Sequence, residues 1–272
     1  MRWSVKTLSF SGLIIILIGF LLSAETWIVE QLQLSAMTGP FFTCASPNVI
    51  TAGSCRRAEE KILKSTVRIR VETWVVEENE KGYFVDVSVG HATVKDGQYL
   101  VTHNHFPIPL SILQQEGEPG VYSVVFLYDT QGRLVHKTPL TDFEVFQQKD
   151  ESLVFAHKES DFLSELGFES AEFMDGRLVP GRAGMEVAQI DWDGQTSRVD
   201  WTTVQEMRLV GETPILVLDD GALPGASGGG IFWNGFHVAN NWHVEERLAA
   251  TGEVVGTTTI VALNTVPDLR PD

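Results

Sequence analysis

Short runs rich in β-branched and aromatic residues follow one another through most of this chain, and they constrain its fold more than any other feature. Turn signals such as Lys95-Asp96-Gly97 separate them. The strands expected before residue 160 are 66–76, 83–94, 98–102, 122–128, 134–137, 143–146 and 153–156. Those expected after residue 180 are 185–190, 198–209, 215–218, 231–239 and 254–262. Such spacing indicates an all-β barrel or sandwich.

A linker divides these runs into two groups. Residues 161–181 carry mixed polar residues without strand periodicity, and residues 57–65 (RAEEKILKS), rich in helix formers, predict one short helix before the first strand. Two β halves joined by a linker are the simplest organisation for a chain of 272 residues.

The first residues predict a membrane anchor. Arg2 and Lys6 precede the uncharged run 7–24 (TLSFSGLIIILIGFLLSA), whose length lies between that of a signal peptide and that of a spanning helix. Bulky Leu22 disfavours cleavage and Trp27 suits the membrane interface, so the sequence favours an uncleaved single-pass helix over residues 1–24. The preceding positive charges place the N-terminus in the cytoplasm and residues 25–272 outside it; cleavage would make the protein secreted.

Residues 25–55 have no sustained period and are interpreted as a juxtamembrane linker. The chain has two cysteines, Cys44 and Cys55, both on the exported side. An oxidising compartment favours a disulfide between them, with two free thiols as the alternative.

The charge balance argues against a nucleic-acid partner. Twenty Lys and Arg against 36 Asp and Glu give a formal net charge of -16, which repels polyanions. No Cys, His or Glu partner stands at metal-ligand spacing from the histidines other than His105, so these are interpreted as structural and no metal site or cofactor is predicted. They include His91, His103, His157, His237 and His243.

The segment 224–230 (PGASGGG) has the composition of a nucleophile loop. Glycines on both sides of Ser227 permit a tight turn with an exposed hydroxyl, and the amides of Gly225 and Ser227 could form an oxyanion hole. An ordinary Gly-Ser loop is the alternative for this segment taken alone.

The segment 97–106 (GQYLVTHNHF) favours the nucleophile loop over the ordinary Gly-Ser loop, because it predicts a strand that ends at a histidine. It resembles the histidine motif of trypsin-like serine proteases, which in HtrA-type bacterial members reads T-N-N-H-V. The resemblance assigns the general base to His105, with His103 in the place of an asparagine.

The segment 149–155 (KDESLVF) is similar to the family segment in which an Asp precedes a short apolar strand, so the resemblance implies that Asp150 orients the histidine. The order His105, Asp150, Ser227 matches that of the family. Asp129 and Asp142 are the competing acids, but Asp129 has the context of a hairpin turn and Asp142 lacks a following apolar run.

The resemblance extends over residues 57–272 and is closest to the HtrA-type bacterial protease domain without a PDZ domain. It implies an all-β fold of two six-stranded antiparallel β-barrels, about 66–160 and 178–267, within a protease domain over residues 56–272. It also implies a serine endopeptidase that needs no cofactor and acts on proteins or peptides. The substrate pocket would include Gly221, Asn241 and Trp242, and Gly221 favours a small to medium apolar P1 residue, the residue before the scissile bond.

Ala226 stands where digestive members carry the Asp that pairs with a new N-terminus, so that activation route is not expected. The main alternative function is a catalytically silent, membrane-tethered binding scaffold with the same fold. An esterase is disfavoured, because the strand-turn-helix context and Ser-first order of that class are missing. The oligomeric state, a homo-oligomer included, stays open.

Overall fold

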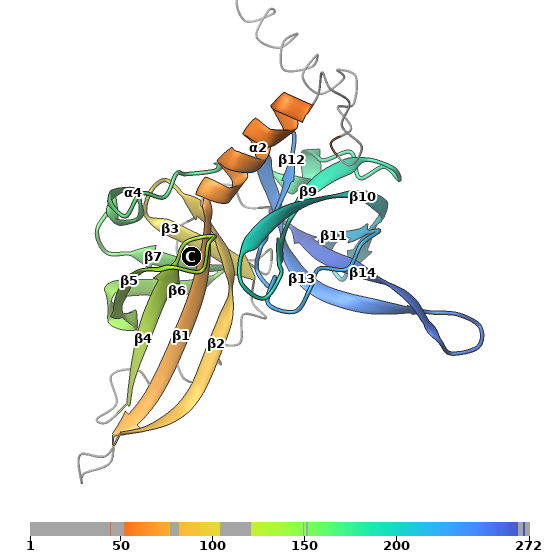
Figure 1. The fold of residues 1–272 in the computed structure, drawn as a ribbon. Coiled ribbons are helices and arrows are strands. Elements are labelled where there is room, and N and C mark those ends of the chain that lie inside the picture. The colour runs from red at the N-terminus through yellow and green to blue at the C-terminus, as the bar shows by residue number, and fades with distance from the viewer. Residues whose placement is uncertain are drawn as a thin grey trace, which may run out of the picture. The chain divides into compact units, whose positions relative to one another are not determined.

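A computed structural model describes Cys44 and residues 52–76, 82–103, 121–148, 150, 152–265 and 269 (Figure 1). The predicted anchor, residues 1–24, lies outside these described residues. Across the described ranges, no helix has the length and apolar character needed to cross a membrane.

Strands dominate the described chain, with short helical elements between them. The helical elements are α2 (Ala52–Lys64), η1 (Leu140–Asp142), α4 (Phe162–Glu165) and η2 (Gly176–Leu178). The strands of the first half are β1 (Thr66–Val76), β2 (Gly82–Lys95), β3 (Tyr99–His103), β4 (Val121–Tyr128), β5 (Leu134–Pro139), β6 (Phe143–Gln147) and β7 (Ser152–His157). Those of the second half are β8 (Glu172–Phe173), β9 (Glu186–Trp192), β10 (Ser197–Val210), β11 (Thr213–Leu218), β12 (Gly230–Trp233), β13 (Phe236–Leu248) and β14 (Val254–Leu263).

The first half forms one antiparallel sheet in the order β5-β4-β1-β2-β3-β7-β6. Its two outer strands, β5 and β6, are halves of one segment that bends at the three-residue helix η1. Since β5 pairs with β4 and β6 pairs with β7, this bent segment closes the sheet into a ring. The seven strands therefore make a barrel with six sides.

The interior of this barrel follows from strand alternation. On β1, Val67, Ile69 and Val71 are buried, whereas Arg68 and Arg70 between them are partly exposed. Successive side chains of a strand point to opposite faces, so the three apolar residues face one core. They pack with apolar residues of β2, β3, β4 and β7.

The second half closes through its own pairings. Its sheet runs β12-β9-β10-β11-β14-β13-β8, and β12 also pairs with β13, so six antiparallel strands form a ring. The two-residue strand β8 adds to β13 in parallel. The all-β expectation of two antiparallel barrels is thereby confirmed.

One strand prediction was wrong in detail. Residues 231–239 were expected to form a single strand, but the chain turns at Asn234 and Gly235, which have φ values of 50° and 85°. Consecutive positive φ angles are those of the tight turn that Asn-Gly favours. The segment is therefore the hairpin of β12 and β13.

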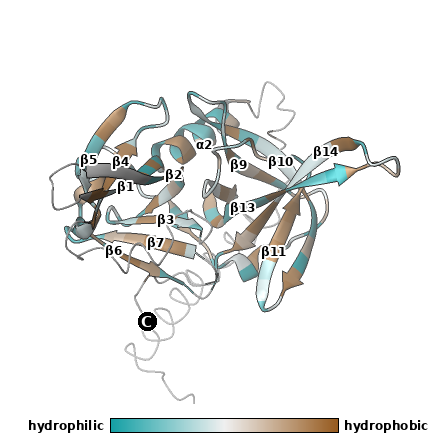
Figure 2. Cartoon of the chain, turned by 90° about the horizontal axis from the view of Figure 1, so that it is seen from below, coloured by the Kyte–Doolittle hydropathy of each residue, from teal (hydrophilic) through white to brown (hydrophobic). Residues whose placement is uncertain are grey.

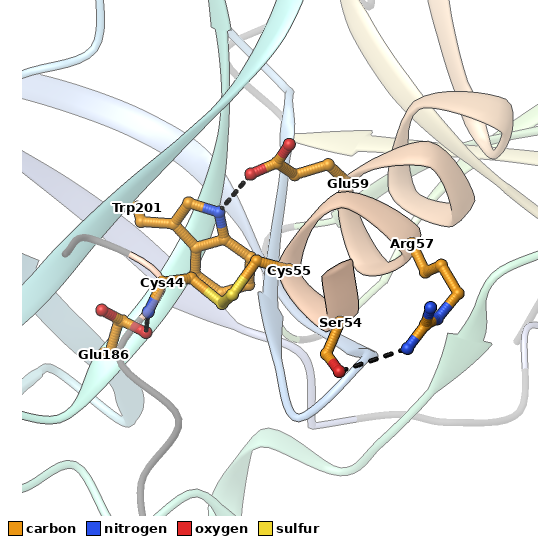
Figure 3. Close-up of a disulfide and its surroundings, with 7 residues drawn as sticks. All are labelled: Cys44, Ser54, Cys55, Arg57, Glu59, Glu186 and Trp201. Atoms are coloured by element: carbon orange, nitrogen blue, oxygen red, sulfur yellow. Dashed lines mark hydrogen bonds between the residues drawn. A yellow bond between two sulfur atoms is a disulfide. The ribbon is translucent and has the colours of Figure 1, made fainter. Parts of the chain in front are cut away.

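A disulfide and two hydrogen bonds connect helix α2 to the second barrel (Figure 3). Cys55 in this helix forms a disulfide with Cys44, which confirms the predicted pairing. The backbone N–H of Cys44 donates to Glu186 of β9 at 2.6 Å, and the indole N–H of Trp201 in β10 donates to Glu59 at 2.8 Å. Closing a loop of this size stabilises a fold by about 3 kcal/mol.

Strands β13 and β14 extend beyond their barrel as a two-stranded ribbon, residues 243–258 (Figure 1). In this ribbon β13 pairs with β14 alone among the described strands, and β14 meets β11 only from Thr259 onward. Figure 2 shows hydrophilic residues along the outer part of β13 and hydrophobic ones on β14, where Val254 and Val255 are exposed.

Candidate active site

Ser227 lies in the glycine-rich loop 219–229, which joins β11 to β12. Gly225 and Gly228 have φ values of 99° and 76°, a region that residues with a side chain rarely adopt. A Cβ atom on Gly225 would also lie 2.7 Å from Cδ1 of Trp192. The turn on either side of Ser227 thus depends on glycine.

The hydrogen bonds of this loop leave two amides available. Gly228 N–H donates to the carbonyl of Asn241 at 3.0 Å, and Asn241 N–H donates to the carbonyl of Gly229 at 2.8 Å. Within the described residues, the N–H groups of Gly225 and Ser227 donate to no acceptor. Both can therefore donate to an oxygen of a bound substrate.

A buried histidine of the first barrel supports this loop. The N–H of His91 in β2 donates to the carbonyl of Ser227 at 2.7 Å, and its Nδ1 lies 2.9 Å from the carbonyl oxygen of Gly225. Because a carbonyl only accepts, Nδ1 carries the proton, and Nε2 accepts from the hydroxyl of Ser197 at 2.8 Å. Burial lowers the pKa of His91 to about 4. The sequence-based interpretation of His91 as structural agrees with these contacts.

His237 of β13 is equally enclosed. Its Nδ1 accepts from the amide of Asn264 at 2.7 Å, its Nε2 lies 3.1 Å from Oδ1 of Asn240, and Phe173 and Phe232 pack on its ring. Burial lowers its pKa to about 3. Both histidines are neutral in the folded protein at neutral pH.

These two histidines predict a loss of stability in mild acid. Between the ordinary histidine pKa of about 6.5 and their folded values, the unfolded chain binds protons that the folded chain does not. We expect the free energy of unfolding to fall as pH drops from 7 to 4, by about 1.4 kcal/mol per pH unit for each histidine. Urea unfolding at several pH values, compared between the wild type and His237→Gln, measures this slope. An unchanged slope in the variant would contradict the assignment.

Asp150 lies immediately before β7 and is buried. Its Oδ1 accepts the N–H of Ser152 at 3.1 Å, and its Oδ2 accepts the N–H of Thr265, after β14, at 2.8 Å. Its carboxylate thus joins the first barrel to the end of the second.

His105 lies outside the described residues, but strand β3, which precedes it in the chain, is described. Strand β3 ends at His103, which pairs with Ser152 of β7. Ser152 is also the residue whose N–H donates to Asp150, so the described end of β3 lies next to the start of β7. The hydroxyl of Thr102 on β3 donates to the carbonyl of His91 at 2.8 Å.

A pocket of about 440 Å³ opens beside Ser227. Gly221, Asn241 and Trp242, the three residues proposed from the sequence, lie in its wall together with Ser227. The Nδ2 of Asn241 donates to the carbonyls of Ile190 and Ala226 at 2.8 and 3.2 Å, which fixes this side of the wall.

Two further side chains narrow the pocket, and sequence reasoning missed both. A Cβ atom on Gly221 would overlap the side chain of Thr257 in β14 and lie 3.2 Å from Cγ1 of Val244 in β13. Their approach to Gly221 depends on the pairing of β13 with β14, which no local motif specifies.

The described residues form two closed antiparallel barrels, with Asp150 at a strand of the first and Ser227 in a glycine loop of the second. Two closed antiparallel barrels are the architecture that the resemblance to trypsin-like serine proteases implied. No family model matches the chain, and no curated protein matches it. Among solved structures, the active form of the Rv3671c protease from M. tuberculosis is similar over 82% of this chain and 86% of its own, with 16% identity and a TM-score of 0.47.

The loop of Ser227 contacts the end of β9, which the sequence did not single out. Asp191 accepts the N–H of Leu223 at 2.8 Å, and the ring of Trp192 packs on Gly225. Over the described residues, no three His, Cys, Asp or Glu side chains gather in a way that could hold a metal ion.

Proposed function

We propose that this protein is a serine endopeptidase that cleaves extracytoplasmic proteins or peptides. The observation that carries this proposal is the position of Ser227. It lies on a turn between two glycines of positive φ, beside a pocket and next to two amides that donate to no described acceptor. Acyl transfer needs this combination of an exposed nucleophile and preorganised donors.

In the proposed reaction, His105 takes the proton of Ser227 as Oγ bonds to the scissile carbonyl carbon. The amides of Gly225 and Ser227 stabilise the resulting oxyanion, while Asp150 holds the imidazole in the tautomer that accepts the proton. The proton passes to the leaving amine as the C–N bond breaks. Water then hydrolyses the acyl-enzyme by the same route and regenerates Ser227.

We also propose that residues 1–24 anchor the protein in a membrane with its protease domain outside the cytoplasm. The Cys44–Cys55 disulfide supports an oxidising location, because such bonds persist mainly in exported proteins.

Labelling of the full chain with a fluorophosphonate tests the proposed chemistry, since this probe reacts with activated serines. We expect one adduct, which peptide mapping places on Ser227, together with casein cleavage. A folded protein that neither reacts nor cleaves would favour the silent binding scaffold.

The narrow pocket predicts a preference for small apolar P1 residues. Thr257 and Val244 fill the space next to Gly221, so peptides with Ala or Val at P1 should exceed those with Phe or Arg in kcat/KM. Thr257→Gly should raise kcat/KM for the P1-Phe peptide by about tenfold relative to P1-Ala, because removing a few buried atoms shifts such discrimination by about 1–3 kcal/mol.

Val255→Gly is the matched control for this prediction, because Val255 lies on the same strand but is exposed away from the pocket. Faster turnover of P1-Arg than of P1-Val would contradict the prediction. It would point instead to Glu246, a carboxylate on the described wall of the pocket.

A further inference from the structure

We propose that Asp191 and Arg198 are positioning residues for the loop that carries Ser227, and that peptide hydrolysis depends on their ion pair. Neither side chain lines the pocket. This inference rests on the proposed endopeptidase function, and it names two groups that would keep the oxyanion-hole amides in place.

The contacts of Asp191 divide between the loop and Arg198. Asp191 lies near the end of β9 with a side chain only 3% exposed. Its Oδ1 accepts the N–H of Leu223 at 2.8 Å, and its Oδ2 lies 2.9 Å from Nη2 of Arg198, its register partner on β10. Both oxygens therefore have a charged or polar partner.

The bond to Leu223 acts close to the oxyanion hole. Only Pro224 separates Leu223 from Gly225, and its ring fixes φ near −65°. A displacement of Leu223 is therefore passed to Gly225 through a stiff connection. The only charged side chains of the loop 219–229 are those of Asp219 and Asp220 at its start, and Asp219 accepts from the hydroxyl of Thr203, so the charge that holds Leu223 comes from Asp191 of another element.

The neighbouring residue adds a second support from the same strand. Trp192 packs against Gly225, and with Ala222 and Ala226 it forms a small buried apolar cluster. The guanidinium of Arg68 lies 4.2 Å from the centroid of the Trp192 ring. The end of β9 thus contacts the loop at Leu223 and at Gly225.

Arg198 is needed to keep Asp191 in place. A buried carboxylate without a cation is costly, and Asp200 competes for the same guanidinium, with its Oδ2 3.1 Å from Nη2 of Arg198. Without Arg198 the two carboxylates would repel each other next to the loop. A lysine at position 198 would keep the positive charge.

The test compares Asp191→Ala, Asp191→Asn, Arg198→Met and Arg198→Lys in the full chain, with Lys64→Met as control. The side chain of Lys64 pairs with Glu169 at the surface and bonds to no residue of the loop or of the candidate triad. We expect kcat to fall about 10- to 100-fold in Asp191→Ala and Arg198→Met, the usual effect of losing a hydrogen bond to a charged group. The KM should change little, and the affinity for a peptide boronic acid should fall in parallel with kcat/KM. Arg198→Lys should recover most of the activity, and Asp191→Asn should be intermediate because it keeps an acceptor for Leu223.

Hydrogen exchange of the peptic fragment around Leu223 gives a readout that does not require activity. Exchange should become faster in Asp191→Ala and stay unchanged in Lys64→Met. Lower thermal stability with an unchanged kcat per titrated site would overturn the proposal, as would unchanged exchange. If the wild type proves inactive, the endopeptidase function fails, and the exchange contrast alone still decides whether Asp191 holds the loop.

Discussion

Replacing Ser227 by alanine is expected to reduce peptide hydrolysis at least about 10⁴-fold and to abolish fluorophosphonate labelling. Loss of the nucleophile removes the covalent route, and what is left is the small catalysis that the oxyanion-hole amides and substrate binding supply. The turn should survive, because Gly225 and Gly228 set its backbone and the bonds to Ser227 from His91 involve main-chain atoms. The rate of casein cleavage and the unfolding midpoint of the same preparation measure both statements.

His105→Ala should lose labelling to a similar degree, since the serine would lack its base. Ser160→Ala, which changes an exposed serine in the first half of the chain, should keep wild-type labelling. Labelling that persists in Ser227→Ala, mapped to another residue, would mean that the nucleophile is assigned wrongly.

Gly228→Ala should destabilise the protein by about 3 to 5 kcal/mol. The φ of 76° costs an alanine about 1–2 kcal/mol, and its Cβ would overlap Oγ1 of Thr102 and the carbonyl oxygen of His91. These atoms belong to β3 and β2, which are core strands of the first barrel, so relief requires movement between the barrels. Urea unfolding measures the loss.

Gly252→Ala separates the cost of a positive φ from the cost of the steric overlap. Gly252 has a φ of 83° at the tip of the ribbon, and a Cβ there would meet no atom within 4 Å. It should cost only about 1–2 kcal/mol, which is the cost of the positive φ alone. Equal costs for the two substitutions would mean that close packing at Gly228 contributes nothing.

The sequence predicts strands well where the chain alternates in and out of a core. On β1, buried Val67, Ile69 and Val71 repeat at period two, and both ends of this strand were placed correctly. The turn at Asn234 and Gly235 was overlooked although its dipeptide is a strong hairpin signal, because apolar residues on both sides suggested one continuous strand.

The outer part of β13 was missed for a different reason. Glu245, Glu246 and Arg247 interrupt the apolar pattern, and this segment is a strand because it pairs with β14. Pairing with the next strand leaves no local trace when neither face is buried. The pattern does predict seven strands before residue 160, but it does not show that β5 and β6 are one bent segment whose two pairings close the first barrel.

Some residues of the candidate site could likewise be predicted from the sequence, and others could not. The loop of Ser227 could be found from sequence because its glycines are consecutive and answer a local backbone requirement. Asp191 could not, since its partner Leu223 lies 32 residues away and the contact requires that β9 reach the loop. His91 was interpreted as structural, but its support of Gly225 and Ser227 became evident only with the two barrels side by side.

The ribbon of residues 243–258 has a consequence for how the protein behaves among its neighbours. Closed barrels hide their strand edges, but a two-stranded ribbon offers backbone donors and acceptors to any extended chain in solution, including another copy. Exposed Leu248, Val254 and Val255 add to this hazard. The exposed charges of Glu245, Glu246 and Arg247 counter it, because strand addition would bring like charges together and strip them of water. Residues that interrupt the strand pattern in the sequence thus act as a guard against aggregation.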